Sequence, residues 1–358
     1  MSDTSKPYAY PYSQAVRLDP RITSPRPIID SALAPLIDSF LLPEKIEPEF
    51  LRDLAAGDGD DAFLDSISKA RPGLQHTEHV ISGLYGIPIT LSIFSPESPS
   101  TVPLPAVYYV HGGGMVSGNR FAEVPSLLDL LEGIACIIVS VEYRLAPETR
   151  APGAAEDCHA GLVWVSDNAV SLGIDPGAIT ICAVSGGAAL AAATCLMARD
   201  KKLPAIPVKA QMLLSPMLDD RCESVSDKQY EYGVPWSGVT NRCAWNHVLG
   251  DSAGTGNVSS YQSPSRAVDL SDLPPTYIDV AECEVFRDPA VAYATKMWRC
   301  GSTCELHVWP GGVHLFDAVK NPDIPLVAVA FTTKQAWLRR VIPNVERRET
   351  SSVRPSTE

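Results

Sequence analysis

The chain has 358 residues, of which 45% are hydrophobic and 20% charged, a composition typical of a globular protein with a large buried core. Its formal charge of -13 argues against a general affinity for nucleic acids or anionic membranes. No apolar run reaches the roughly eighteen residues that span a bilayer, and the polar start does not resemble a secretory signal. We therefore expect a cytoplasmic protein whose nine cysteines stay reduced, without nucleic-acid partners or stable membrane insertion.

Short apolar runs rich in β-branched residues begin after about residue 80 and alternate with helical patterns. This alternation predicts an α/β protein with a mostly parallel central sheet flanked by helices in three layers. The expected strands are Pro88–Ser95, Pro103–Val110, Ile134–Val141, Ile179–Val184, Val208–Leu214, Thr276–Val280 and Glu305–Trp309. The expected helices between them are Val124–Glu132, Ala154–Leu172, Ala188–Arg199, Pro289–Cys300 and Leu326–Val341.

The segments outside this alternation predict a cap. Residues 1–30 look like an extended arm, followed by helical patterns at Ile28–Phe40 and Pro48–Ser66 with no strand between them. About sixty residues separate the Val208–Leu214 and Thr276–Val280 strands, more than a plain connection needs. We interpret these parts as a helical cap over the carboxyl ends of the strands. The predicted division is an arm and cap contribution at 1–70, a core at 71–219 and 263–343, a cap insertion at 220–262 and a disordered tail at 344–358.

A serine flanked by small residues stands at a predicted strand-to-helix junction. The segment Ala183-Val184-Ser185-Gly186-Gly187 is a variant of G-x-S-x-G with alanine in the first position. In that motif a sharp turn exposes the serine above the sheet, and small neighbours let strand and helix pass closely. The helix N-terminus also favours negative charge developing near Ser185. Because serine between glycines is common in plain turns, the motif alone leaves both interpretations open.

A glycine-rich loop, His111-Gly112-Gly113-Gly114, directly follows the Pro103–Val110 strand. Three glycines allow backbone N–H groups to converge on one point, as an oxyanion hole requires. A phosphate-binding loop is the alternative, but the lysine and serine or threonine that end such a loop are absent. Together with Ser185, the loop favours an oxyanion hole.

A catalytic histidine should follow the serine and an acid in the chain. His314 lies on a glycine-containing loop after the last predicted strand and is the best candidate for a general base, whereas His307 lies within that strand. Three carboxylates compete for the role of the acid after the Thr276–Val280 strand. They are Glu282, Glu284 and Asp288, and spacing alone does not choose among them.

Taken together, these residues resemble the hormone-sensitive-lipase-like branch of the α/β-hydrolase fold, over roughly residues 80–320. The branch includes microbial carboxylesterases and plant carboxylesterase-like proteins. Several independent motifs in the right order carry the likeness. They are His111–Gly114, Val141–Glu148, Glu156-Asp157, Gly173–Pro176 leading to Ser185, Ser215–Arg221, and Gly311 with His314.

The resemblance implies roles for individual residues. Ser185 would be the nucleophile, His314 the base and Glu284 the acid, in a position where the family usually has aspartate. Asp288 ranks second as the acid. The oxyanion hole implied is formed by the backbone N–H groups of Gly113, Gly114 and Gly186.

Two neighbours of the serine depart from the family pattern. Val184 replaces an aspartate beside the nucleophile, and Ala189 replaces an asparagine that is common four residues after it. These changes alter the polarity around Ser185 without removing any of the three implied catalytic groups.

The sequence thus predicts a carboxylic-ester hydrolase that acts on small to medium apolar esters or lactones, without metal or cofactor. Alternatives left open are an acyltransferase, lactonase, or cyclase or lyase acting on a specialised natural product, and a non-catalytic ligand receptor. A homodimer is also left open. The residues expected to line the substrate pocket are Met115, Tyr230, Trp236 and Leu315.

Overall fold

A computed structural model describes residues 21–33, 47–56, 59–98, 100–318 and 320–343. An eight-stranded sheet forms its centre, with strand order β1-β2-β4-β3-β5-β6-β7-β8. The first three strands in this order pair antiparallel, and all later neighbours pair parallel. The strands are β1 (Leu74–Ser82), β2 (Pro88–Pro96), β3 (Leu104–Val110), β4 (Ile137–Glu142), β5 (Ile174–Val184), β6 (Ala210–Leu214), β7 (Thr276–Ala281) and β8 (Cys304–Trp309).

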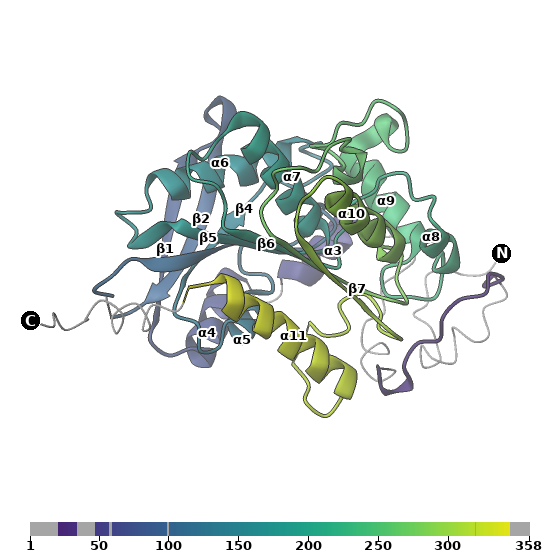
Figure 1. Cartoon of the computed structure of the whole chain (residues 1–358), viewed down its shortest axis with the longest axis horizontal. Coiled ribbons are helices and arrows are strands. Elements are labelled where there is room, and N and C mark those ends of the chain that lie inside the picture. Colours follow the sequence, from purple (N-terminus) through teal and green to yellow (C-terminus); the bar gives the residue numbers. More distant parts are fainter. Residues whose placement is uncertain (1–20, 34–46, 57–58, 99, 319, 344–358) are drawn as a thin grey trace, which may run out of the picture.

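Helices cover both faces of this sheet (Figure 1). α6 (Gly153–Asp167), α7 (Ser185–Lys201) and α10 (Arg287–Arg299) lie on one face. α5 (Val124–Leu130) and α11 (Pro325–Val341) lie on the other, with α4 (Asp60–Ala70) beside α5. Strands β3 and β7 are entirely buried, as expected for strands covered on both faces. The predicted three-layer α/β class is confirmed.

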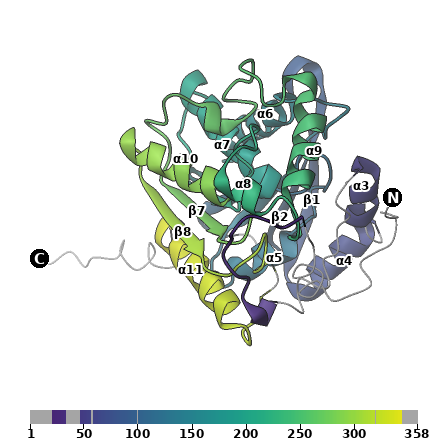
Figure 2. The same ribbon diagram turned by 90° about the vertical axis from the view of Figure 1, so that its right-hand side faces the viewer.

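The remaining helices gather at one side of the molecule. In Figure 2, α8 (Val225–Gln229) and α9 (Gly238–Leu249) lie in front of the sheet, with α3 (Pro48–Ala56) and α4 to their right. Residues 21–33 cross the same side as an extended segment, apart from a 3-10 turn at Ser31–Leu33. The Arg26 guanidinium donates to the carbonyl oxygen of Tyr232 at 2.8 Å. This arrangement supports the interpretation of these segments as a cap, whose exact division from the core stays a prediction.

Strand β1 was not expected from the sequence. It pairs antiparallel with β2 from Leu74 opposite Pro96 to Ser82 opposite Pro88. Ile81 is its only buried residue, because β1 forms the edge of the sheet and much of its surface meets solvent. Such a strand lacks the run of apolar residues by which the central strands were recognised.

Strand β5 begins earlier than expected. Ile174 already pairs with Leu104, and the register shifts before the regular pairing resumes at Ala106 with Ile179. The Asp175 carboxylate accepts the Gly177 N–H at 3.0 Å, a local turn contact that lies within this irregular start of the strand. Placing the strand boundary at Ile179 was therefore wrong.

The predicted N-terminal helices also differ from the structure. The described part of the helix expected over Ile28–Phe40 is residues 28–33, where the structure has a 3-10 turn at Ser31–Leu33; residues 34–40 lie outside the described residues. The pattern over Pro48–Ser66 forms two helices, α3 and α4. Gly59 precedes α4 with a φ of 93°, a backbone conformation that glycine adopts easily and that does not continue a helix. The predicted disordered tail also lies outside the described residues.

Candidate active site

Ser185 stands where β5 passes directly into α7. Its φ of 54° lies in the left-handed region, which is unfavourable for a residue with a side chain. Gly187 has no room for a side chain, because a Cβ there would lie 2.1 Å from the carbonyl oxygen of His111. At Gly186 a Cβ would lie 2.7 Å from the backbone nitrogen of Met115. The small residues after Ser185 therefore let the glycine-rich loop pack directly against the turn.

Three side chains form a continuous hydrogen-bonded chain. Ser185 Oγ lies 3.1 Å from His314 Nε2, and His314 Nδ1 lies 2.6 Å from Glu284 Oε2. All three follow the carboxyl ends of parallel strands: Ser185 follows β5, Glu284 follows β7 and His314 follows β8. In the sheet β6 separates β5 from β7, and β7 and β8 are neighbours. A carboxylate that accepts a hydrogen bond from Nδ1–H keeps the proton on Nδ1. The other ring nitrogen, Nε2, is then an acceptor for the serine hydroxyl.

Glu284 is fully buried, and both of its carboxylate oxygens accept hydrogen bonds. Its second oxygen, Oε1, accepts the Ala281 N–H at 2.7 Å and the Ser215 hydroxyl at 3.1 Å. A buried carboxylate is costly unless such donors surround it. These bonds hold the carboxylate in position beneath the imidazole of His314.

The two competing carboxylates point elsewhere. Asp288 Oδ2 accepts the backbone N–H of Ser226 at 2.7 Å, and its Oδ1 pairs with Arg287, so it supports the start of α8. Glu282 accepts the N–H of Gly311 at 3.0 Å. Among the three candidates, the structure brings only Glu284 to His314.

The loop after β3 directs its N–H groups in two ways. Gly112 donates to Glu123 Oε2 at 2.9 Å and is therefore occupied. Gly113 and Gly114 have φ values of 98° and 62°, and no acceptor in the described part of the chain takes their N–H groups. Gly186 lies in the first turn of α7, where N–H groups have no partner within the helix. The three glycines implied by the family resemblance thus lie together with unpaired donors.

His111 supports this loop from below as a neutral side chain. Burial lowers its pKa to about 4. Its ring stacks on Tyr143 with a centroid distance of 4.1 Å, and the Tyr143 hydroxyl donates to the carbonyl oxygens of His111 and Gly112 at 2.9 and 3.1 Å. The loop is therefore supported by a rigid, uncharged pair of stacked rings.

A cavity of about 390 Å³ opens onto Ser185 and His314, and we name it the Ser185 pocket. Trp236 and Leu315 line it, as the sequence predicts. Met115 and Tyr230 do not. Met115, which directly follows the glycine-rich loop, is buried, and its carbonyl accepts the Ala146 N–H. Tyr230 is buried as well, and its hydroxyl donates to the carbonyl of Pro27 at 3.2 Å. Side chains of α3 and α4 complete the wall, namely Leu51, Ala55 and Phe63.

Two residues of the site escaped the sequence reasoning. Ser215 lies in a segment that matches the family, but nothing in its spacing indicates that it holds the acid. Glu123 lines the Ser185 pocket and holds Gly112, and no motif marks it.

Within the described residues, no cluster of histidine, cysteine, aspartate or glutamate could bind a metal ion.

Comparison with known proteins places this site in a family. A family model for the alpha/beta hydrolase fold matches residues 107–318. Esterase LipI of Mycobacterium tuberculosis is 30% identical over 278 residues, which cover 76% of this chain and 85% of that protein. A bacterial heroin esterase of known structure aligns with a TM-score of 0.78 and 32% identity, over 88% of this chain and 98% of that one. A structure described as one of two fungal esterases from Rhizomucor miehei aligns with a TM-score of 0.75 and 27% identity, over 88% and 98%.

The chain therefore belongs to the α/β-hydrolase family, in the hormone-sensitive-lipase-like branch that its motifs resemble.

Proposed function

We propose that the protein is a serine carboxylesterase with Ser185 as nucleophile, His314 as general base and Glu284 as the acid. The observation that carries this is the continuous contact from Ser185 through His314 to Glu284 beside unpaired backbone donors. The esterases among its relatives support the same reaction class.

The geometry accounts for each step of ester hydrolysis. His314 Nε2 accepts the proton of the Ser185 hydroxyl while the oxygen attacks the acyl carbonyl. Glu284 holds the imidazole in the tautomer this requires and stabilises the imidazolium that forms. His314 then gives the proton to the leaving alcohol. A water molecule, activated by His314 in turn, hydrolyses the acyl-enzyme and releases the carboxylic acid product from Ser185.

The negative charge of the tetrahedral intermediate needs preorganised donors. The N–H groups of Gly113, Gly114 and Gly186 lie beside Ser185 and have no other partner among the described residues, so they can receive the oxyanion. One such donor contributes about 2.7–4 kcal/mol of transition-state stabilisation in comparable sites. The α7 N-terminus adds a favourable electrostatic field.

The size of the Ser185 pocket supports small to medium esters or lactones as substrates. A volume of about 390 Å³ lies near the lower end of the range for small-molecule sites. The carbon-rich side chains of Leu51, Phe63 and Trp236 line it, so an apolar acyl or alcohol group fits best.

Purified protein and Ser185→Ala should be compared on a panel of chromogenic short-chain esters. We expect turnover by the wild type and a loss of roughly 10⁴-fold or more in kcat for the variant, with an unchanged circular dichroism spectrum. Absence of turnover for every ester, with Ser185→Ala changing only ligand affinity, would favour a ligand receptor. Transfer of the acyl group to an added alcohol in preference to water would favour an acyltransferase.

Location and assembly are separate proposals. No helix in the described residues is long and apolar enough to cross a membrane. We propose a cytoplasmic location, supported by nine free cysteines of which six are buried as thiols. Cell fractionation tests the location, and light scattering on the purified protein tests the homodimer.

A further inference from the structure

We propose that Glu123 determines specificity in the Ser185 pocket, where its carboxylate accepts a hydrogen bond from a hydroxyl or ammonium group of the substrate. This inference rests on the proposed esterase function, because it names the class of ester that the same pocket prefers.

One oxygen of Glu123 is fixed by the protein. Oε2 accepts the Gly112 N–H at 2.9 Å and the Tyr109 hydroxyl at 3.0 Å. Tyr109 is buried in β3, and burial together with the charge of Glu123 raises the pKa of its phenol, so it stays a donor. The carboxylate therefore has little freedom to rotate away from the pocket.

The other oxygen of Glu123 is available. No donor in the described part of the chain bonds to Oε1, although the residue lines the same cavity as Ser185 and His314. Oε1 lies beside the glycine-rich loop, since a Cβ at Gly112 would be only 2.9 Å from it. A fixed acceptor is thus presented to a cavity whose walls are mainly apolar.

No cation of the described residues neutralises Glu123. Arg120, three residues earlier, is engaged with other carboxylates, those of Asp60, Glu78 and Glu142. A carboxylate beside an apolar cavity loses hydration when a wholly apolar ligand fills that cavity, and this costs free energy. A ligand that brings a donor to Oε1 avoids that cost, and an ammonium group adds attraction between opposite charges.

The backbone at Glu123 is also unusual. Its φ of 59° and ψ of 2° lie in the left-handed region immediately before α5, where glycine or asparagine would fit with less strain. Strained residues in sites are kept in place by surrounding contacts, here those of the carboxylate itself. The conformation places a glutamate where the pocket meets the loop.

Two pairs of substrates test the proposal. On the acyl side, phenyl 6-aminohexanoate is compared with phenyl heptanoate. On the alcohol side, 2-aminoethyl acetate is compared with propyl acetate, and hydroxyl-terminated analogues of both provide the neutral donor. The quantity measured is the ratio of kcat/KM for the donor-bearing ester to that for its methyl-terminated partner, which cancels general effects on the chemistry.

The variant is Glu123→Gln, whose carbonyl oxygen can still accept from Gly112 and Tyr109 while an amide NH₂ replaces Oε1. We expect the ratio to fall tenfold or more for the ammonium esters of one pair, and less for the hydroxyl esters. Glu132→Gln removes an exposed carboxylate elsewhere and serves as the matched control for net charge. It should leave the ratio unchanged.

An unchanged ratio in Glu123→Gln for both pairs, with neutral esters still hydrolysed, would overturn the specificity role and leave the esterase proposal standing. Equal falls in Glu123→Gln and Glu132→Gln would overturn it as well, because they would reflect net charge. Lack of hydrolysis of every neutral ester by the wild type would instead contradict the esterase function on which the inference rests.

Discussion

Replacing Lys334 by methionine removes an ammonium group that lies between two buried carboxylates. Lys334 belongs to α11 and is 5% exposed. Its Nζ contacts Asp317 and lies 3.2 Å from Asp279 Oδ2. Asp317 follows His314 by three residues, and Asp279 lies in β7, so the lysine joins the histidine loop to the sheet.

The expected loss in the free energy of unfolding follows from the burial of all three groups. Removing one partner of a buried ion pair leaves uncompensated charge and lowers the free energy of unfolding by about 3–5 kcal/mol. Burial already raises the pKa of Asp279 to about 6, with Asp317 adding repulsion and Lys334 opposing the rise. The same two carboxylates raise the pKa of Lys334 to about 12 against the effect of its own burial.

The loss of stability should depend on pH. A carboxyl group whose pKa is raised on folding destabilises the folded state as pH rises through that pKa. Without Lys334 the pKa of Asp279 rises further, and each added unit corresponds to about 1.4 kcal/mol. We therefore expect Lys334→Met to lose about 3–5 kcal/mol at pH 8 and at least about 1 kcal/mol less than that at pH 5.

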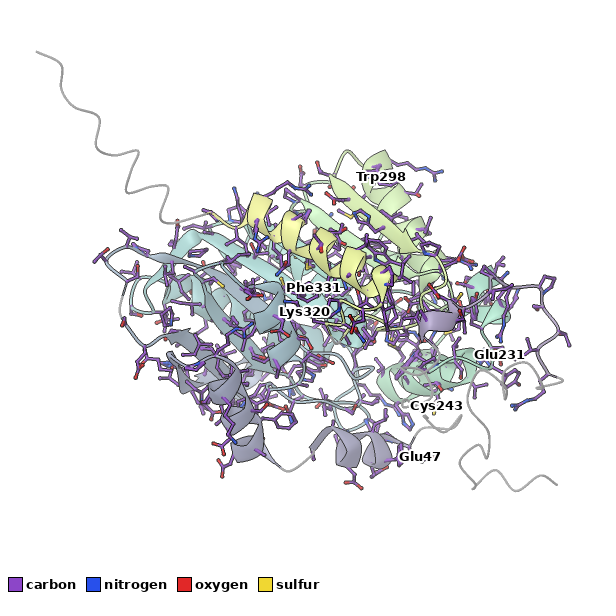
Figure 3. All side chains as sticks on the ribbon, turned by 90° about the horizontal axis from the view of Figure 1, so that it is seen from below. Glu47, Glu231, Cys243, Trp298, Lys320 and Phe331 are labelled. Atoms are coloured by element: carbon purple, nitrogen blue, oxygen red, sulfur yellow. The ribbon has the colours of Figure 1, made fainter. Side chains whose placement is uncertain are left out.

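Urea unfolding followed by tryptophan fluorescence at pH 5 and pH 8 measures this difference. Lys320→Met is the control, because the Lys320 side chain is 46% exposed and its ion-pair partner Glu132 is exposed as well. The Lys320 ammonium lies over the Phe331 ring, and both residues are labelled in Figure 3. Lys320→Met should change stability by less than about 1 kcal/mol. A loss in Lys334→Met that is equal at both pH values, or no larger than in the control, would refute the reasoning.

Three further predictions concern the site itself. Glu284→Gln should lower kcat by roughly 10³–10⁴-fold, because the wrong imidazole tautomer is favoured, whereas Asp288→Asn should cost less than about tenfold; the reverse order in ester-hydrolysis assays would reassign the acid. Gly187→Ala should destabilise the protein by more than about 2 kcal/mol in thermal unfolding, since its Cβ would clash with a backbone carbonyl, and a normal Tm would contradict this. Because the pKa of His111 is lowered to about 4 in the folded state, the unfolded state binds the His111 proton at a higher pH than the folded state does. Stability should therefore fall by about 2 kcal/mol between pH 7.5 and pH 5. In His111→Gln this contribution to the pH dependence of the urea midpoint should disappear.

The central sheet and the positions of Ser185 and His314 follow from local features of the sequence. Buried strands need continuous apolar runs, and these runs located seven of the eight strands. A strand-to-helix turn needs small residues, and the close approach of backbone atoms to Gly186 and Gly187 shows why no larger side chain fits there. The glycine-rich loop likewise adopts φ values that glycine allows, so its chemistry could be recognised before its position was known.

Tertiary structure decided which distant groups meet. Glu284 and Asp288 are four residues apart, and spacing alone does not choose between them. The backbone path after β7 directs Glu284 to His314 and Asp288 to α8. The sequence does not predict the edge strand β1, because its mostly exposed residues do not form an apolar run. Glu123 is brought to the pocket by contacts with Gly112 and Tyr109, eleven and fourteen residues away. Local sequence patterns report backbone geometry and burial, whereas the direction of a single side chain depends on everything that packs around it.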